Sequence, residues 1–200
     1  MINLKSFCLI LDNGHGDPPL TGGKCSPDGR IKEYYWARDM VNRIAAKARA
    51  IGIRTEILVP EKSDVALKER VRRANALCAK YGKANCIVIS VHINAAAGSG
   101  WHNASGFSSW VAPNASTKSK ELAKILWECA DVAGLRGNRS VPAGRYWVGN
   151  FAIVRDTYCP AVLTENLFMD NRNEVDFLMS ESGKETIANI HIDAIKKFIK

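Results

Sequence analysis

The chain has 200 residues, of which 46% are hydrophobic and 24% charged, as is usual for a globular protein with one α/β core. No apolar run approaches the roughly 20 residues of a membrane span, so we expect no stable membrane insertion. The net charge of +8 suits an anionic polymer as partner, or basic residues that only solvate the surface. Because no nucleic-acid motif is present, we expect no nucleic-acid partner.

Apolar runs and helical periodicities alternate along the first half of the chain. Apolar residues recur at three- and four-residue steps after Glu33, which predicts an amphipathic helix. Ser63 or Asp64 is expected to cap the next helix. The predicted elements are a strand at 7–11, a Gly- and Pro-rich loop at 17–30, a helix at 33–51, a strand at 53–59, a helix with Leu67, Val71, Ala74, Cys78 and Tyr81 inward, and a strand at 86–93.

The second half continues the alternation. Its predicted elements are a loop at 95–105, a strand at 106–111, a helix at 116–133 with Val132 among its inward residues, a polar loop at 134–149, strands at 151–154 and 161–165, a short helix at 174–179 and a final helix at 181–200. This order predicts an α/β fold: one domain over residues 1–200, with a mixed, mostly parallel twisted sheet of about six strands and helices on both faces.

The cysteines predict packing rather than metal binding. They are Cys8, Cys25, Cys78, Cys86, Cys129 and Cys159, and none forms a C-x-x-C pair. Two lie in predicted strands and two on apolar helix faces, where free Cys behaves as a small hydrophobe. This use of cysteine suits a chain that folds in a reducing compartment.

Four polar residues stand where predicted elements begin or end. His15, His92 and Glu165 each follow an apolar strand, and Glu33 opens the first helix. Functional side chains of mostly parallel sheets gather at the carboxyl ends of the strands, so we expect these four on one rim.

Two imidazoles and two carboxylates can supply three zinc ligands and one general base. Glu33 suits the ligand role because a helix start anchors it. Glu165 suits the base role because an apolar strand precedes it, a setting that raises a carboxyl pKa. There is no H-E-x-x-H helix, and a lone His at a strand end is more often structural, so spacing alone does not decide between these readings.

Several segments resemble the zinc-dependent N-acetylmuramoyl-L-alanine amidases of the amidase-3 type. Segment 11–16 (LDNGHG) is similar to the family's first metal motif, and 90–95 (SVHINA) to its second histidine motif. Segment 160–166 (PAVLTEN) resembles the catalytic-glutamate strand, and 67–71 (LKERV) with Ala74-Asn75 resembles the second helix. The likeness covers nearly the whole chain in the family's order.

The resemblance implies that His15, Glu33 and His92 bind Zn²⁺ and that Glu165 is the catalytic acid/base. It also implies hydrolysis of the amide between N-acetylmuramic acid and L-alanine in peptidoglycan, in cell-wall lysis or remodelling. The chain departs from the family pattern where Asn13 replaces a usual Pro, Asp17 a usual Gly and Leu167 a frequent Gly. These departures concern loop shape and substrate detail rather than the proposed ligands.

Three further residues are candidates for substrate contact. Asn94 follows the second histidine, His102 could line the cleft beside it, and Trp101 lies in a loop that could reach substrate. Alternative functions are a different zinc hydrolase, such as a peptidase or deacetylase, and a wall-binding module without activity. A Cys-His peptidase is disfavoured because Cys25 precedes Ser26-Pro27 in a loop and does not open a helix.

The expected setting is the bacterial cell wall. The short apolar run at 7–11 leads directly into the first histidine motif, so we expect synthesis in the cytoplasm without a signal peptide. The chain then resembles the catalytic domain of a phage endolysin released by lysis, or a host autolysin exported in a non-classical way. The sequence does not decide between these, nor does it give the target bacterium, the stem-peptide preference, the oligomeric state or the secondary oxyanion donors.

Overall fold

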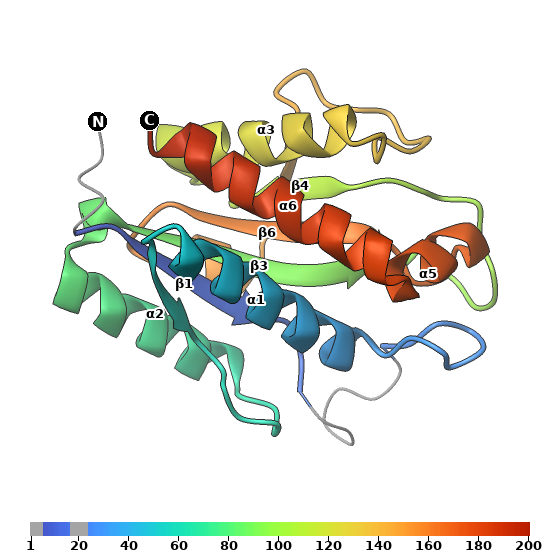
Figure 1. The fold of residues 1–200 in the computed structure, drawn as a ribbon, viewed down its shortest axis with the longest axis horizontal. Coiled ribbons are helices and arrows are strands. Elements are labelled where there is room, and N and C mark those ends of the chain that lie inside the picture. Colours follow the sequence, from blue (N-terminus) through green and yellow to red (C-terminus); the bar gives the residue numbers. More distant parts are fainter. Residues whose placement is uncertain (1–5, 17–23) are drawn as a thin grey trace.

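A six-stranded sheet forms the centre of the computed structural model, which describes residues 6–16 and 24–200 (Figure 1). The strands are β1 (Cys8–Asn13), β2 (Arg54–Ile57), β3 (Cys86–Asn94), β4 (Ser108–Val111), β5 (Trp147–Val148) and β6 (Ala161–Phe168). Their order is β2-β1-β3-β6-β4-β5. The first four run parallel, and β4 pairs antiparallel with β6. The carboxyl ends of β1, β3 and β6 therefore lie on the same edge.

Helices cover both faces of this sheet (Figure 1). They are α1 (Glu33–Ala50), α2 (Leu67–Tyr81), α3 (Thr117–Val132), α4 (Ala152–Arg155), α5 (Arg172–Met179) and α6 (Glu181–Phe198), with a 3₁₀ turn at Lys83–Asn85. One core contains α1, α3, α5 and α6, and a smaller core contains α2 and α4. The predicted fold class is confirmed. Among the described residues, no helix is long and apolar enough to cross a membrane.

Burial on both faces explains the continuous apolar runs of the central strands. In β1, Leu9 and Leu11 belong to the larger core, whereas Cys8 and Ile10 belong to the smaller one. A strand covered on both sides has no solvent-facing positions, so its sequence does not alternate between apolar and polar residues. This is why the strands at 7–11 and 86–93 could be located from sequence.

Three local predictions were wrong. The segment 151–154 is helix α4 with flanking turns rather than a strand, because a short apolar run does not distinguish the two. Strand β5 lies inside the predicted loop 134–149. Helix α2 begins after Ala66 without a side-chain cap, since Asp64 instead accepts a hydrogen bond from Arg70.

The expected inward residues also need two corrections. Leu67 is 60% exposed and Val132 is 87% exposed, although both were predicted on buried helix faces. Leu67 is the first residue of α2 and lines a cavity, and Val132 is the last residue of α3. The predicted loop at 17–30 is described only from Lys24 onward, and Asp17 lies outside the described residues.

A bulge interrupts the pairing of β6 with β3 just after Glu165. His92 pairs with Glu165 but Asn94 pairs with Phe168, so β6 contains one extra residue. Leu167 sits in this bulge with a φ of 67° and is 2% exposed. Left-handed backbone is where glycine fits best, which gives a physical reason for the frequent Gly at this position in the family that the chain resembles.

At Leu167, loss of the buried side chain and relief of the left-handed backbone change the free energy of unfolding in opposite directions. Together they predict an order of stability among variants. Replacing a buried Leu with Ala costs about 2–5 kcal/mol, whereas relieving a left-handed conformation returns about 1–2 kcal/mol. Leu167→Gly should therefore lower the free energy of unfolding by about 1–3 kcal/mol, and Leu167→Ala by more. Urea denaturation of the three proteins measures this. A glycine variant more stable than the wild type, or less stable than the alanine variant, would contradict the account.

Candidate metal and catalytic site

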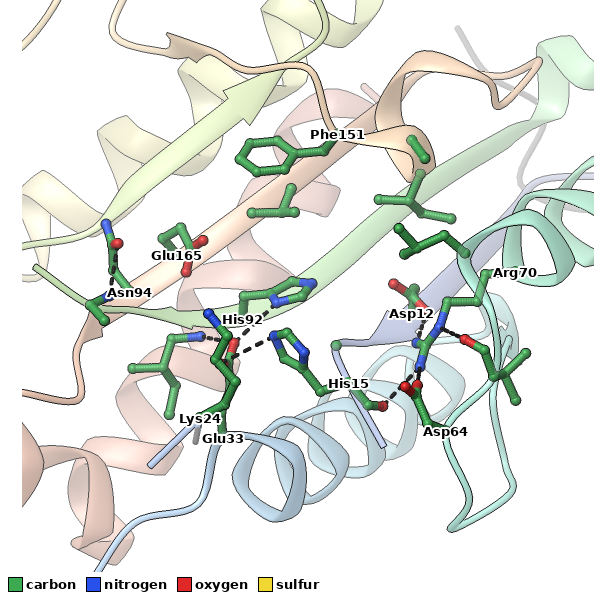
Figure 2. A pocket seen from close by; sticks show the side chains of 18 of the residues that line it. Asp12, His15, Lys24, Glu33, Asp64, Arg70, His92, Asn94, Phe151 and Glu165 are labelled. Carbon is green, nitrogen blue, oxygen red and sulfur yellow. Dashed lines mark hydrogen bonds and ion pairs between the residues drawn. The ribbon is translucent and has the colours of Figure 1, made fainter. Parts of the chain in front are cut away.

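His15, Glu33 and His92 converge at the carboxyl edge of the sheet (Figure 2). His15 follows β1, His92 lies near the end of β3, and Glu33 is the first residue of α1. His15 Nε2 is 3.3 Å from Glu33 Oε2, and His92 Nδ1 is 3.0 Å from Glu33 Oε1. One ligand atom from each residue lies within 4.8 Å of the others. Sequence analysis expected these three residues on one rim, and the structure brings them together.

Glu33 is a buried carboxylate that both imidazoles contact. It is 2% exposed, and its Oε1 also accepts a hydrogen bond from the Ile93 backbone at 3.0 Å. Burial alone raises the pKa of this carboxyl, but hydrogen bonds from His15 and His92 outweigh it and hold the pKa at about 2. In turn burial opposes a charge on His92, yet the Glu33 carboxylate raises the pKa of His92. The carboxylate of Glu33 thus shares protons with both imidazoles, and a metal ion that binds here takes the place of those protons.

Close packing and a strained backbone fix the first histidine motif. A Cβ at Gly14 would come within 2.2 Å of the His92 ring, so only glycine fits there. His15 itself has a φ of 62°, in the left-handed region that few non-glycine residues adopt. Such a conformation persists only when its surroundings enforce it.

Arg70 of α2 enforces the shape of this turn. Its side chain is 2% exposed, and its five N–H donors all have acceptors. The acceptors are Val65 O at 2.8 Å, Asp12 Oδ1 at 2.7 Å, Asn13 O at 2.6 Å, His15 O at 2.8 Å and Asp64 Oδ1 at 3.2 Å. The guanidinium therefore holds the last residues of β1 and the histidine turn in one arrangement.

A chain of polar contacts leads from Arg70 to the second histidine. Asp12 Oδ2 accepts a hydrogen bond from Ser90 Oγ at 2.6 Å, and Ser90 Oγ lies 3.1 Å from His92 Nε2. Since the single Ser90 proton goes to Asp12, Ser90 Oγ accepts the Nε2 proton of His92. Nδ1 is therefore the ring nitrogen that faces Glu33. In the charged imidazole it donates its proton to Glu33 Oε1, and after loss of that proton its lone pair points to the same side.

Asn13 also has a role at the end of β1. Oriented so that its hydrogen bonds are satisfied, its side chain donates to Val59 O and accepts from Arg38 Nη1, both at 3.0 Å. A proline, the usual residue of the family that the chain resembles, could make neither bond. The side-chain amide of Asn13 therefore links β1 to α1 and to the segment after β2.

Glu165 lies beside the cluster, on the neighbouring strand. It pairs with His92 in the β3–β6 register, and its buried Oε2 has no hydrogen-bond partner among the described residues. Burial raises the pKa of Glu165 to about 7, while the positive charge of His92 opposes this and the charge of Glu33 adds to it. An unpaired carboxyl with a pKa near neutrality is suited to proton transfer.

These residues line one cavity of about 690 Å³. Lys24 and Arg155 place cationic groups in its lining, and Phe151 and Leu67 contribute apolar surface. Asn94 also lines it, as sequence analysis expected of a substrate contact.

The other two candidate substrate contacts lie elsewhere. Trp101 and His102 are not in the cavity lining. The Trp101 ring instead stacks on the Arg172 guanidinium at 4.4 Å, and the His102 backbone donates to Asp170 O at 2.7 Å. Contact of Trp101 and His102 with substrate stays a prediction.

The donor set fits a zinc ion. Two imidazole nitrogens and one carboxylate oxygen are a common catalytic zinc combination, and their mutual distances suit one shared ion. Sequence analysis missed the residues that hold this set in place: Asp12 and Arg70 were noted as parts of motifs, but nothing in the sequence links them. Ser90 was likewise noted only as part of a motif, and Lys24 and Phe151 carried no signal.

Comparison with known proteins agrees with the motifs. Residues 9–197 match the family model described as N-acetylmuramoyl-L-alanine amidase. The chain is 32% identical to the endolysin of Bacillus phage SPP1, over 97% of the chain and 66% of that protein. It is 29% identical to the N-acetylmuramoyl-L-alanine amidase CwlM of Bacillus licheniformis, over 70% of the chain and 50% of that protein.

The fold is also shared with solved structures. The N-acetylmuramyl-L-alanine amidase of Mycobacterium smegmatis superposes with a TM-score of 0.83 at 20% identity, covering 98% of each chain. The chain spans about two thirds of the phage endolysin and half of CwlM, so the match concerns one part of those proteins. Because the family model covers nearly all of the sequence, the chain belongs to the amidase-3 family of N-acetylmuramoyl-L-alanine amidases.

Proposed function

We propose that this chain is a zinc-dependent amidase that hydrolyses the bond between N-acetylmuramic acid and L-alanine in peptidoglycan. The observation that carries the proposal is the buried carboxylate of Glu33 between His15 and His92, with the unpaired carboxyl of Glu165 beside them in one cavity. Membership of the amidase family supports the choice of bond.

His15, Glu33 and His92 would hold the metal. Two neutral imidazoles and one carboxylate leave a bound Zn²⁺ with net positive charge, so it would polarise the scissile carbonyl and acidify the attacking water. The Arg70–Asp12–Ser90 chain keeps His92 in the tautomer that presents Nδ1. Hydrogen bonds to the side chains that bind a metal commonly decide how tightly the metal is held.

Glu165 would carry the proton between water and leaving group. Its carboxylate accepts a proton as the water attacks, and the resulting acid returns the proton to the amine of L-alanine. Burial favours both proton transfers, since it raises the pKa of Glu165 to about 7. The ladder between β3 and β6 fixes its distance from His92.

The cavity lining is compatible with a muropeptide. Apolar surface from Phe151 and Leu67 can pack on a sugar or a peptide side chain, and Lys24 can attract a stem-peptide carboxylate. Arg155 also lines the cavity, but its guanidinium is paired with Asp156. Similarity to a phage endolysin supports action on the cell wall, as either a lysin or an autolysin.

The first prediction concerns metal content. Removing one of three ligands removes most zinc affinity, so His92→Ala should lose most of its zinc on dialysis. His102→Ala, a histidine outside the cavity, should keep about one zinc per chain. Elemental analysis of both variants measures this. Full zinc retention in His92→Ala would reject His92 as a ligand.

The second prediction concerns Glu165. Glu165→Gln preserves shape but cannot accept a proton, and general acid–base catalysis contributes about 10²–10⁴-fold. Cleavage of a purified muropeptide, followed by mass spectrometry, should slow by roughly that factor with zinc content unchanged. The products should carry a free amine on alanine, whereas a peptidase would cut inside the stem and a deacetylase would free glucosamine.

The pH profile adds a second readout for the same residue. Activity requires the unprotonated carboxylate, so kcat/KM should rise with pH on an acidic limb. A bound dication lowers a neighbouring carboxyl pKa, so the limb should lie at or below about 7. Loss of zinc together with activity in Glu165→Gln would make Glu165 a ligand, and activity within about tenfold of wild type would reject the mechanism.

The third prediction tests the polar chain behind His92. Ser90→Ala removes the acceptor of the Nε2 proton, and loss of such a partner typically weakens metal binding about 10–100-fold. Competition with a chromogenic chelator measures the zinc Kd. Ser109→Ala is the matched control, since Ser109 is equally buried but donates to Ala123 O, away from the site. Equal zinc affinity in both variants would show that Ser90 does not position His92.

A further inference from the structure

Four cysteines gather at the amino end of the sheet, away from the cavity. Cys8 in β1 and Cys86 in β3 are direct partners in the strand register. Val88 pairs with Ala161, and its N–H bonds to Pro160 O at 2.9 Å. Extending this register by two residues places Cys159 beside Cys86, so three cysteines form a row across three neighbouring chain segments.

Helix α2 brings the fourth cysteine over this row. The Asn75 side chain donates to Asp156 O at 3.0 Å and accepts from Tyr158 N at 2.8 Å, which fixes α2 against the segment before β6. Cys78 follows Asn75 by one helical turn. Cys86 Sγ lies 3.9 Å from Leu77 O, so the cysteine row lies directly beneath Cys78. All four cysteines are reduced, and none is more than 6% exposed.

The arrangement favours chemistry between two thiols over metal binding. Among the residues that the structure describes, only His15, Glu33 and His92 meet the distance limit for a shared ion. A row of thiols does not surround a central point as a tetrahedral site requires. Neighbouring thiols in contact can instead be joined by oxidation.

The thiols differ in reactivity. A hydrogen bond from the Cys159 thiol lowers the pKa of Cys78 to about 7. Burial raises the pKa of Cys8 to about 11 and that of Cys86 to about 12. Because the thiolate is the nucleophile, Cys78 is the member of the cluster that reacts first. It contacts both Cys159 and Cys86, and its stronger interaction is with Cys159.

We propose that Cys78 and Cys159 are an oxidative modification site, at which a peroxide closes a disulfide between α2 and the segment entering β6. The Cys78 thiolate attacks one peroxide oxygen and breaks the O–O bond, which gives a sulfenic acid and releases hydroxide. The Cys159 sulfur then attacks the Cys78 sulfur and expels the sulfenic oxygen, which leaves as water with the Cys159 proton. Two thiols lose two electrons and the peroxide gains them.

The disulfide would connect α2 to the segment that precedes β6, at the ends of these elements that lie away from the cavity. Helix α2 carries Arg70, and β6 carries Glu165, whereas the disulfide lies at the opposite edge of the sheet. Oxidation should therefore restrain unfolding without altering the metal-binding residues. Closing a loop between residues 78 and 159 restricts the unfolded chain, so the oxidised protein should have the higher Tm.

The test uses Cys25→Ser protein, which lacks the exposed cysteine and its intermolecular reactions. Treatment with hydrogen peroxide should lower the mass by about 2 Da and block alkylation of two thiols under denaturing conditions. Peptide mapping should find Cys78 joined to Cys159, and dithiothreitol should reverse both changes. A bond between another pair, or a mass gain from oxygen at Cys78 without a bond, would overturn the proposal.

Variants give an independent check. Cys78→Ala and Cys159→Ala should each abolish the mass loss and the rise in Tm. Cys129→Ala is the matched control, because Cys129 is buried on α3 beside Lys197 and outside the cluster. If an alanine variant does not fold, mapping of the Cys25→Ser protein still decides the question. A mass loss that persists in a folded Cys159→Ala variant would also reject this pair.

Discussion

The buried guanidinium of Arg70 is the interaction on which the site depends. A charge that is 2% exposed is tolerable only when it is fully paired, and here two carboxylates and three backbone carbonyls supply the partners. Removing the guanidinium would leave Asp12 as an uncompensated buried charge. It would also release the carbonyl of His15, whose left-handed backbone needs outside support. One residue of α2 thus links charge balance in the core to the position of a proposed metal ligand.

At the other side of the site, the buried negative charge of Glu33 also needs partners. A carboxylate buried between two histidines would be costly if its negative charge had no partners. The imidazoles and the Ile93 N–H provide partners in the structure, and the low pKa of Glu33 shows how strongly the charged form is favoured. Glu165, one strand away, lacks such partners, and its pKa is raised. Two carboxylates in one cavity are thereby separated into an ionised ligand candidate and a proton-transfer candidate by their hydrogen bonds.

Sequence analysis located every strand except β5 and every α-helix except α4, because burial on two faces leaves long apolar runs and helix periodicity is regular. It placed His15, Glu33 and His92 together from their positions at element ends, with support from the family motifs. It missed Arg70 and Ser90 because their partners lie 58 and 78 residues away, at distances in sequence that no local pattern records. It mistook α4 for a strand because four apolar residues carry no periodicity. For Trp101 and His102 the structure gives contacts with Arg172 and with Asp170 O, and their contact with substrate stays a prediction.

The residues proposed for chemistry and those that line the rest of the cavity belong to different parts of the fold. His92 and Glu165 are fixed to each other by the β3–β6 ladder, and Asn166 in the following bulge donates to His92 O at 2.9 Å. Residues held in this way keep their geometry when surrounding loops change. The cavity lining, by contrast, takes Lys24, Phe151 and Arg155 from outside the central strands. If the proposed chemistry holds, relatives that share the strands but differ in these segments should keep that chemistry and bind different substrates.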